Sequence, residues 1–179
     1  MSTATKTLWK IDPTHSEIRF KVKHLVISTV TGNFKSFEGQ IEADGEDFEN
    51  ASAYFEADID SISTNNEDRD NHLKSDDFFN AEKYPQLTFE SSAFEKVVDN
   101  KFKVTGNLTI RDITKEVELD VIHGGTVDDA YGNTKAGFEI TGTINRKEFG
   151  LTWNAVTEAG NVVVADDIKL QLNVQLVQS

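Results

Sequence analysis

The one-by-one alternation of apolar and polar residues is the feature that most limits how this chain can fold. The stretch DIKLQLNVQLV, residues 167–177, places Ile, Leu and Val on one side and Lys, Gln and Asn on the other. Because successive side chains of a β-strand point to opposite faces, this pattern predicts a strand with one buried face. Seven other stretches alternate in the same way: residues 15–25, 37–43, 51–59, 86–94, 101–110, 115–123 and 137–145.

Short turn signals, rather than helices, separate most of these stretches. They are Asp44-Gly45, Asp99-Asn100, Gly124-Gly125 and residues 131–133. Strands joined by such short connections pair antiparallel. A long antiparallel sheet with one apolar face must close on itself or stack on a second sheet. We therefore predict an all-β fold, an antiparallel barrel of about eight strands, with a two-sheet sandwich as the second choice.

One segment breaks the alternation and predicts a short helical insert near residues 66–82. Asn65 or Asn66 can cap such a helix at its N-terminus. Leu73 and the pair Phe78-Phe79 would then face the barrel, and the segment would end at Pro85. The insert can be a plug that closes one end of the barrel or a lid over a cavity.

Composition narrows the classes of function. The 179 residues suit a single domain spanning 1–179, and a net charge of −13 disfavours binding to nucleic acid and to anionic lipid surfaces. The absence of Cys excludes disulfides and thiolate catalysis. No apolar run reaches the roughly 18 residues of a membrane span, and no apolar signal segment opens the chain. We therefore expect no integral membrane segment and a cytoplasmic protein, or a periplasmic one if a signal was removed.

Glycines lie inside three of the predicted strands, each between two inward apolar residues. They are Gly39, Gly106 and Gly142. A strand glycine can serve curvature, or its missing side chain can leave room for a guest. A barrel of about eight strands either fills its interior or holds one small ligand. Because the inward residues are almost all aliphatic or Phe, any ligand would be apolar and elongated.

The sequence supports no catalytic machinery. It contains no nucleophile elbow, Walker A motif or GxGxxG, and we expect neither a metal nor a cofactor. The run DRDNH, residues 68–72, lacks the Gly and Glu that a calcium loop needs, so a solvated helix face is expected there. His24 and His123 have inward parity. One of them can meet the polar head of a ligand, and the alternative is a satisfied core or rim histidine.

Five stretches together are distinctive: DPTHSEIRFKVKHL, GNFKSFEG, RDNHLKSDDFFNAEKYPQLTF, VTGNLTIRDITKEVELDV and NRKEFGL. In this order, and covering almost the whole chain, they resemble the YceI family. The resemblance implies a lipocalin-like barrel with a lipid-filled tunnel, and it implies that homodimers can form. It also implies that the strand Gly and Ala residues line the tunnel and that residues 69–79 form a helical segment at its mouth.

The favoured hypothesis is a non-catalytic carrier or store for a polyisoprenoid, a quinone or a fatty-acid derivative. Two alternatives remain: an enzyme that acts on such a lipid, and a stress-related structural protein with a packed core. The residues expected to contact the ligand are Phe20, Val22, His24, Phe37, Gly39, Phe55, Ala57, Phe78, Phe79, Phe89, Gly106, Phe138, Ile140, Gly142 and Trp153.

Overall fold

The structure is a computed structural model that describes residues 6–25, 27–154 and 164–179. Within these residues, eleven strands form one sheet, accompanied by helix α1 (Glu67–Lys74) and the 3-10 helices η1 (Pro13–His15), η2 (Ile59–Ser61) and η3 (Arg146–Phe149). The strands are β1 (Thr7–Ile11), β2 (Glu17–His24), β3 (Ser28–Phe34), β4 (Phe37–Asp44), β5 (Asp47–Asp58), β6 (Ile62–Ser63), β7 (Gln86–Val98), β8 (Lys101–Ile110), β9 (Ile113–Asp128), β10 (Thr134–Asn145) and β11 (Val164–Gln178).

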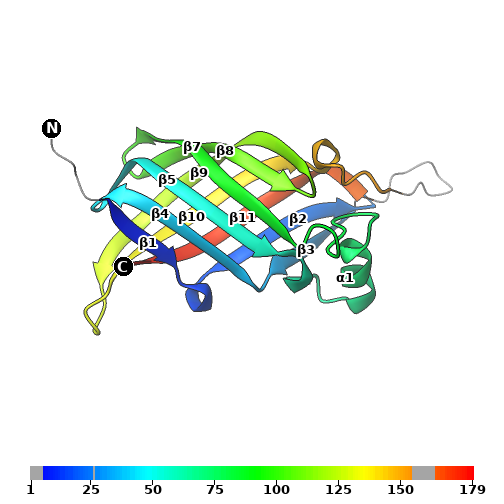
Figure 1. Cartoon of the computed structure of the whole chain (residues 1–179), viewed down its shortest axis with the longest axis horizontal. Helices are drawn as coiled ribbons and strands as arrows, with labels where there is room; N and C mark the ends of the chain where they lie inside the picture. Colours follow the sequence, from blue (N-terminus) through cyan, green and yellow to red (C-terminus); the bar gives the residue numbers. More distant parts are fainter. Residues whose placement is uncertain (1–5, 26, 155–163) are drawn as a thin grey trace.

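Strand β11 pairs with both β1 and β2, and the pairing with β1 closes the barrel. Trp9 of β1 lies opposite Gln178, whereas Phe20 of β2 lies opposite Leu170, farther back along β11. Because β1 also pairs with β4, a closed antiparallel ring runs through β1, β4, β5, β7, β8, β9, β10 and β11 (Figure 1). The predicted barrel of about eight strands is confirmed, and the alternative sandwich is not formed.

The break between β1 and β2 has a local cause. Pro13 lacks the backbone N–H that a ladder needs, and it opens η1. The carboxylate of Asp12 accepts hydrogen bonds from the backbone N–H of Thr14 at 3.0 Å and from its hydroxyl at 2.6 Å. This turn starts a second strand beside β11. Strands β2, β3 and β6 then extend the sheet beyond the ring, at the end where α1 lies (Figure 1).

The predicted short helical insert near residues 66–82 is confirmed. Helix α1 covers residues 67–74, and turns follow it as far as residue 83. The helix begins where Asn66 accepts a hydrogen bond from the N–H of Arg69, which confirms one of the two predicted caps. It ends where both the N–H and the hydroxyl of Ser75 donate to the carbonyl of His72.

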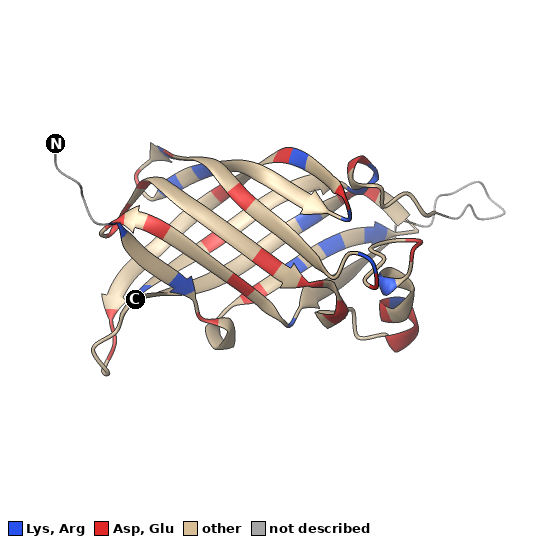
Figure 2. Cartoon of the chain, viewed as in Figure 1, with Lys and Arg blue, Asp and Glu red and all other residues tan. Residues whose placement is uncertain are grey.

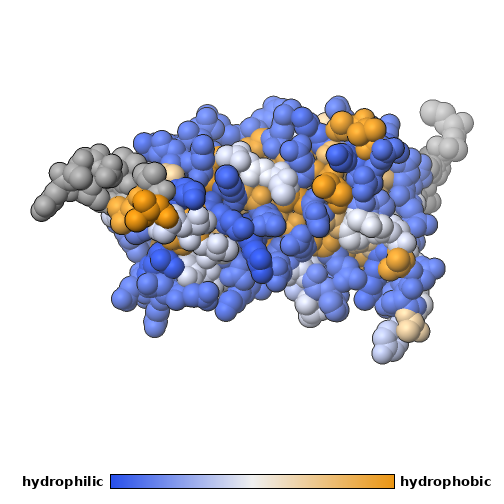
Figure 3. Space-filling view, turned by 180° about the vertical axis from the view of Figure 1, so that it is seen from behind, coloured by the Kyte–Doolittle hydropathy of each residue, from blue (hydrophilic) through white to orange (hydrophobic). Residues whose placement is uncertain are grey.

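The two faces of the strands differ as the alternation predicts. Phe102, Val104 and Leu108 of β8 are buried, while the residues between them are half-buried or exposed, apart from Gly106. Acidic and basic residues are scattered along the strands and α1 (Figure 2), and the face of β9, β10, β11 and β2 is mostly hydrophilic (Figure 3). Across the described ranges, helices are too short and too polar to traverse a bilayer.

Two other details differ from the prediction. Gly124 and Gly125 do not form a turn but lie inside β9, beside a register shift in its pairing with β10. The turn follows at residues 129–133, where the carboxylate of Asp129 accepts from the N–H groups of Tyr131 and Asn133. Strands β1, β3 and β6 were not expected from the sequence.

Candidate functional site

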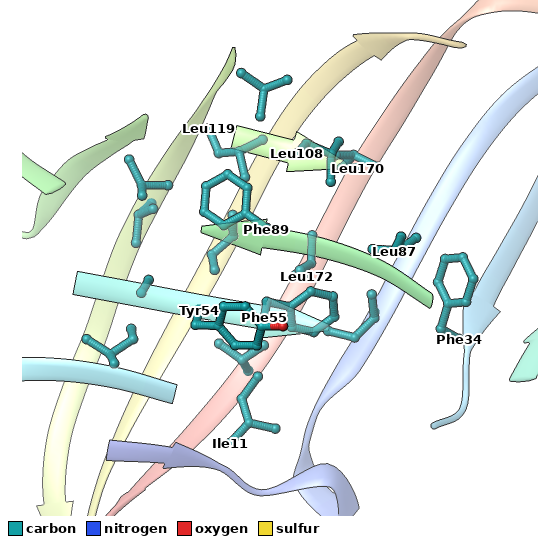
Figure 4. A pocket seen from close by; sticks show the side chains of 18 of the residues that line it. Ile11, Phe34, Tyr54, Phe55, Leu87, Phe89, Leu108, Leu119, Leu170 and Leu172 are labelled. Atoms are coloured by element: carbon teal, nitrogen blue, oxygen red, sulfur yellow. The ribbon is translucent and has the colours of Figure 1, made fainter. Parts of the chain in front are cut away.

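The barrel encloses two adjoining apolar chambers. The inner chamber has a volume of about 150 Å³ and lies among side chains from the ring strands, including Ile11, Phe55, Phe89, Leu119 and Leu172 (Figure 4). The outer chamber has a volume of about 210 Å³ and extends to α1 and the turns after it. The residues common to both linings are Phe20, Phe34, Leu87, Ile110, Ile144 and Leu170.

Aromatic rings mark the boundary between the chambers and continue into the insert. The ring of Phe34 lies 5.7 Å from the ring of Phe20 and 6.3 Å from the ring of Phe79, measured between centroids. Phe79 follows α1 and lines only the outer chamber. These rings connect strands β2 and β3 to the insert, so the insert forms one wall of the outer chamber. Whether it opens as a lid stays a prediction.

A second aromatic cluster also lines the outer chamber. The imidazole of His72 makes edge contacts with the ring of Phe78 at 5.1 Å and with that of Trp153 at 4.7 Å, measured between ring centroids. The Nε2 atom of His72 lies 2.8 Å from a carboxylate oxygen of Asp77. Since His72 belongs to α1 and Trp153 follows η3, this cluster joins the insert to a segment far away in the chain.

Two arginines line the outer chamber, and the chain holds them differently. Arg69 donates from Nε to the Thr64 hydroxyl at 2.8 Å and from Nη2 to the Thr64 carbonyl at 2.6 Å. The carboxylate of Asp70 in turn accepts from the N–H and the hydroxyl of Thr64. The arrangement fixes Arg69 through a neutral residue instead of a direct ion pair.

Arg146 is almost fully buried, with 2% of its surface exposed. Its guanidinium donates to the backbone carbonyls of Leu151, Trp153, Val164 and Ala165, and the carboxylate of Asp166 lies 3.9 Å away. Burial lowers the pKa of Arg146, although an arginine stays charged in proteins. Arg146 therefore holds together the chain segments before and after it in the wall of the outer chamber. Among the described residues, its positive charge has one carboxylate within 4 Å, that of Asp166.

The structure places many of the predicted ligand contacts in the chamber walls. Phe55, Phe89 and Ile140 line the inner chamber, and Phe20 lines both. The predicted residues that line the outer chamber alone are Val22, His24, Phe78, Phe79 and Trp153. Contact of these residues with a ligand stays a prediction.

The other predicted residues do not line either chamber: Phe37, Gly39, Ala57, Gly106, Phe138 and Gly142. The expectation that glycines leave room for a guest is wrong at Gly106 and Gly142. A Cβ atom at Gly106 would meet the Phe89 ring at 2.5 Å, and one at Gly142 would collide with Leu119. A neighbouring strand therefore already fills the space beside each glycine.

Several lining residues were missed by sequence reasoning. Phe34 belongs to β3, a strand that was not expected, although its motif GNFKSFEG was noted. Arg146 lies in the noted stretch NRKEFGL, but its role was not predicted, because its partners are carbonyl groups up to 19 residues away. Of the two inward histidines, His24 lines the outer chamber, whereas His123 packs against Phe48 and Phe138 and lines neither.

Comparison with known proteins agrees with this architecture. Residues 9–176 match the profile of the YceI-like domain. The chain belongs to the YceI family. One relative is the UPF0312 protein SA2479 of Staphylococcus aureus strain N315, which is 38% identical over 170 residues, covering 94% of this chain and 96% of that protein.

Several solved structures resemble this barrel. The YceI protein of Campylobacter jejuni has 38% identity and a TM-score of 0.77, covering 88% of this chain and 90% of the other. A polyisoprenoid binding domain from Saccharophagus degradans has 16% identity and a TM-score of 0.68, covering 96% and 98%. The second likeness shows the shared fold alone.

Proposed function

We propose that this YceI protein binds one long-chain apolar or amphiphilic molecule inside its barrel and releases it unchanged. A polyisoprenoid, a quinone or a fatty-acid derivative would fit this description. The observation that carries the proposal is the pair of adjoining chambers, whose linings are mostly aliphatic and aromatic. The related fold of a polyisoprenoid binding domain supports it.

Apolar chambers of this size favour a guest on physical grounds. Native interiors are close-packed, and residual cavities destabilise a protein by about 24 cal/mol for each Å³. An apolar chain in the chambers would restore the missing dispersion contacts and remove its own surface from water. The packed-core alternative is disfavoured, because a packed core would leave no chambers of about 150 and 210 Å³.

The enzyme alternative differs from binding by one observable. We infer no catalysis, since the inner chamber is lined almost wholly by apolar side chains and the arginines of the outer chamber donate to protein oxygens. Carrier and enzyme therefore predict different fates for the same guest. The carrier returns it unchanged, and the enzyme returns a product.

The test is solvent extraction of protein purified from its native host, followed by mass spectrometry. We expect about one long-chain molecule for each barrel and the same molecule after prolonged incubation. Repeated extraction without a stoichiometric lipid would overturn the proposal, and conversion of the guest would favour the enzyme.

As for other partners, we propose that the chain, with its net charge of −13, binds no nucleic acid. Measurable binding to duplex DNA at physiological salt would contradict this proposal.

A further inference from the structure

The charged side chains that line the chambers are all basic. The outer chamber is lined by Arg69, Arg146 and Lys23, together with the imidazoles of His24 and His72, and the inner chamber by Arg19. Neither lining, among the residues that the structure describes, includes an Asp or a Glu. The whole chain has 31 acidic residues against 18 Lys and Arg, so the linings reverse the overall balance.

We infer that the ligand carries an anionic head group, which binds Arg69 at the α1 end of the outer chamber while the apolar tail extends into the inner chamber. This inference rests on the proposed function and selects among its ligands. It favours a long-chain carboxylate or prenyl phosphate over a quinone or an alcohol.

Of the two arginines that line the outer chamber, Arg69 has a donor group that no described residue occupies. Its Nε and Nη2 bond to Thr64, and no hydrogen bond to a described residue uses its Nη1. The donors of Arg146, by contrast, are directed at four backbone carbonyls. A guanidinium matches the geometry of carboxylate and phosphate oxygens, and such charge-assisted hydrogen bonds are stronger than neutral ones.

Two carboxylates of the insert are bonded to other residues. Asp70 bonds to Thr64, and Asp77 bonds to His72, but neither carboxylate lines the chamber. Arg146 adds a buried positive charge, with Asp166 no closer than 3.9 Å. Charges act over a longer range in a water-poor interior than in solution. The charged residues that line this end of the chamber therefore favour a negative head group.

The division of polar groups between the chambers sets the orientation of the ligand. Among the described residues, Arg19, Gln40 and Tyr54 are the only polar ones in the lining of the inner chamber. Arg19 lies on the outward parity of β2, between Ile18 and Phe20, and its guanidinium pairs with Glu17 at 2.9 Å. The inner chamber thus suits a hydrocarbon tail.

The experiment compares ligand pairs that share a tail and differ in the head group. Affinities are measured for hexadecanoate against hexadecan-1-ol and for geranylgeranyl phosphate against geranylgeraniol, using the full chain. We expect the anionic member of any pair that binds to bind at least tenfold more tightly. Equal affinities within a pair would overturn the inference and leave the proposed function intact. Failure of all four to bind would count against the proposed function itself.

Variants on one helix test the role of Arg69. Arg69→Gln should abolish the preference for the anion while the neutral ligand keeps its affinity. Lys74→Gln, which removes the same charge from α1 at a position outside the chambers, should change neither affinity. If Arg69→Gln weakens both ligands alike, Arg69 serves only to hold the insert and the inference is wrong. Arg69→Lys, which keeps the charge without the planar fork, should retain part of the preference.

Discussion

At the scale of single residues, some strand glycines of this barrel make room for large side chains of neighbouring strands. A Cβ atom at Gly106 would lie 2.5 Å from both the Phe89 ring and the carbonyl oxygen of Glu90. Gly39 is similarly crowded by Ile11 and Phe55. Aromatic rings that cover strand glycines stabilise a sheet where the glycine alone would weaken it. These glycines therefore support the walls of the cavity indirectly, through the side chains that they accommodate.

The first prediction concerns Gly106. Gly106→Ala should destabilise the protein by about 1–3 kcal/mol, because the backbone of Glu90 cannot yield as a side chain can. Gly137→Ala is the matched control, since no atom lies within 4 Å of its added Cβ. That change should be neutral or stabilising by up to about 1 kcal/mol. The measurement is urea denaturation. Equal effects of the two changes would contradict the interpretation that Gly106 makes room for its neighbours.

A second prediction concerns the pH dependence of stability. Burial of His123 against Phe48 and Phe138 lowers its pKa, and hydrogen bonding to Gly125 opposes the shift. As the pH falls through about 6.5, His123 takes up a proton in the unfolded chain but stays neutral in the folded protein. The free energy of unfolding therefore decreases as the pH drops below this value.

His123→Phe removes this titrating group and should make the loss of unfolding free energy between pH 7 and pH 5 smaller. Urea denaturation at both values measures it, with wild-type protein as the reference. An unchanged loss would show that His123 is not responsible for the dependence.

Sequence reasoning identified strand glycines by parity but could not say what fills their places. Parity shows the face to which Gly142 belongs, whereas its occupancy depends on Leu119 in a neighbouring strand. That neighbour is fixed by register and side-chain rotamers, which no local pattern encodes. The same reason explains why Arg146 was missed, since its partners come together only after folding.

At the scale of elements, the insert is attached to the barrel by a few specific contacts. Arg111, in the turn between β8 and β9, donates to the carbonyls of Asp76 and Phe78 and pairs with the Asp76 carboxylate at 2.8 Å. Phe78 is buried, and the half-buried Leu73 and Phe79 pack against the core. Segments with few buried contacts open at a lower free energy than the core around them.

The third prediction is that Arg111→Ala loosens the insert selectively. Hydrogen exchange in residues 67–84 should become faster, while exchange in β8 and β10 stays as in the wild type. Lys115→Ala is the control, because it removes a positive charge from exposed β9 surface without touching the insert. Faster exchange throughout the barrel would mean that Arg111 stabilises the whole fold and does not fasten the insert alone.

Elements with clean alternation were predicted well, and short or interrupted ones were not. Strand β11 alternates over most of its length, but β1 has only five residues and includes the fully buried Trp9. The doublet Gly124-Gly125 predicted a turn because its local signal is strong. Pairing of β9 with β10 continues past it, and Gly125 takes a φ of 139° there.

At the scale of the whole molecule, ring closure and an apolar lining together produce the chambers. Closure removes the free edges of the ring strands, and the alternation turns every apolar face inward. The barrel was predictable because both properties follow from the pattern. The division into two chambers was not, since it depends on how Phe20 and Phe34 pack at their boundary.

Two alanines on the same face of β5 provide the sharpest test of this interior. Ala53 is half-buried and lines the inner chamber, whereas Ala57 is fully buried and lies opposite Phe37 and Leu87 in the two neighbouring strands. Replacing either with Leu adds the same volume at the same strand parity. Only their surroundings differ, so the pair separates filling of a chamber from overpacking of a core.

We expect Ala53→Leu to keep the melting temperature of the ligand-free protein and to lose binding of a fluorescent long-chain probe, because the new side chain occupies the chamber of about 150 Å³. Ala57→Leu should instead cost about 1–3 kcal/mol through overpacking. Thermal melts without ligand and titrations with the probe measure both effects. A large destabilisation by Ala53→Leu would show that the inner chamber is closed by relaxation in solution. Normal binding by a stable Ala53→Leu protein would mean that the ligand occupies the outer chamber alone.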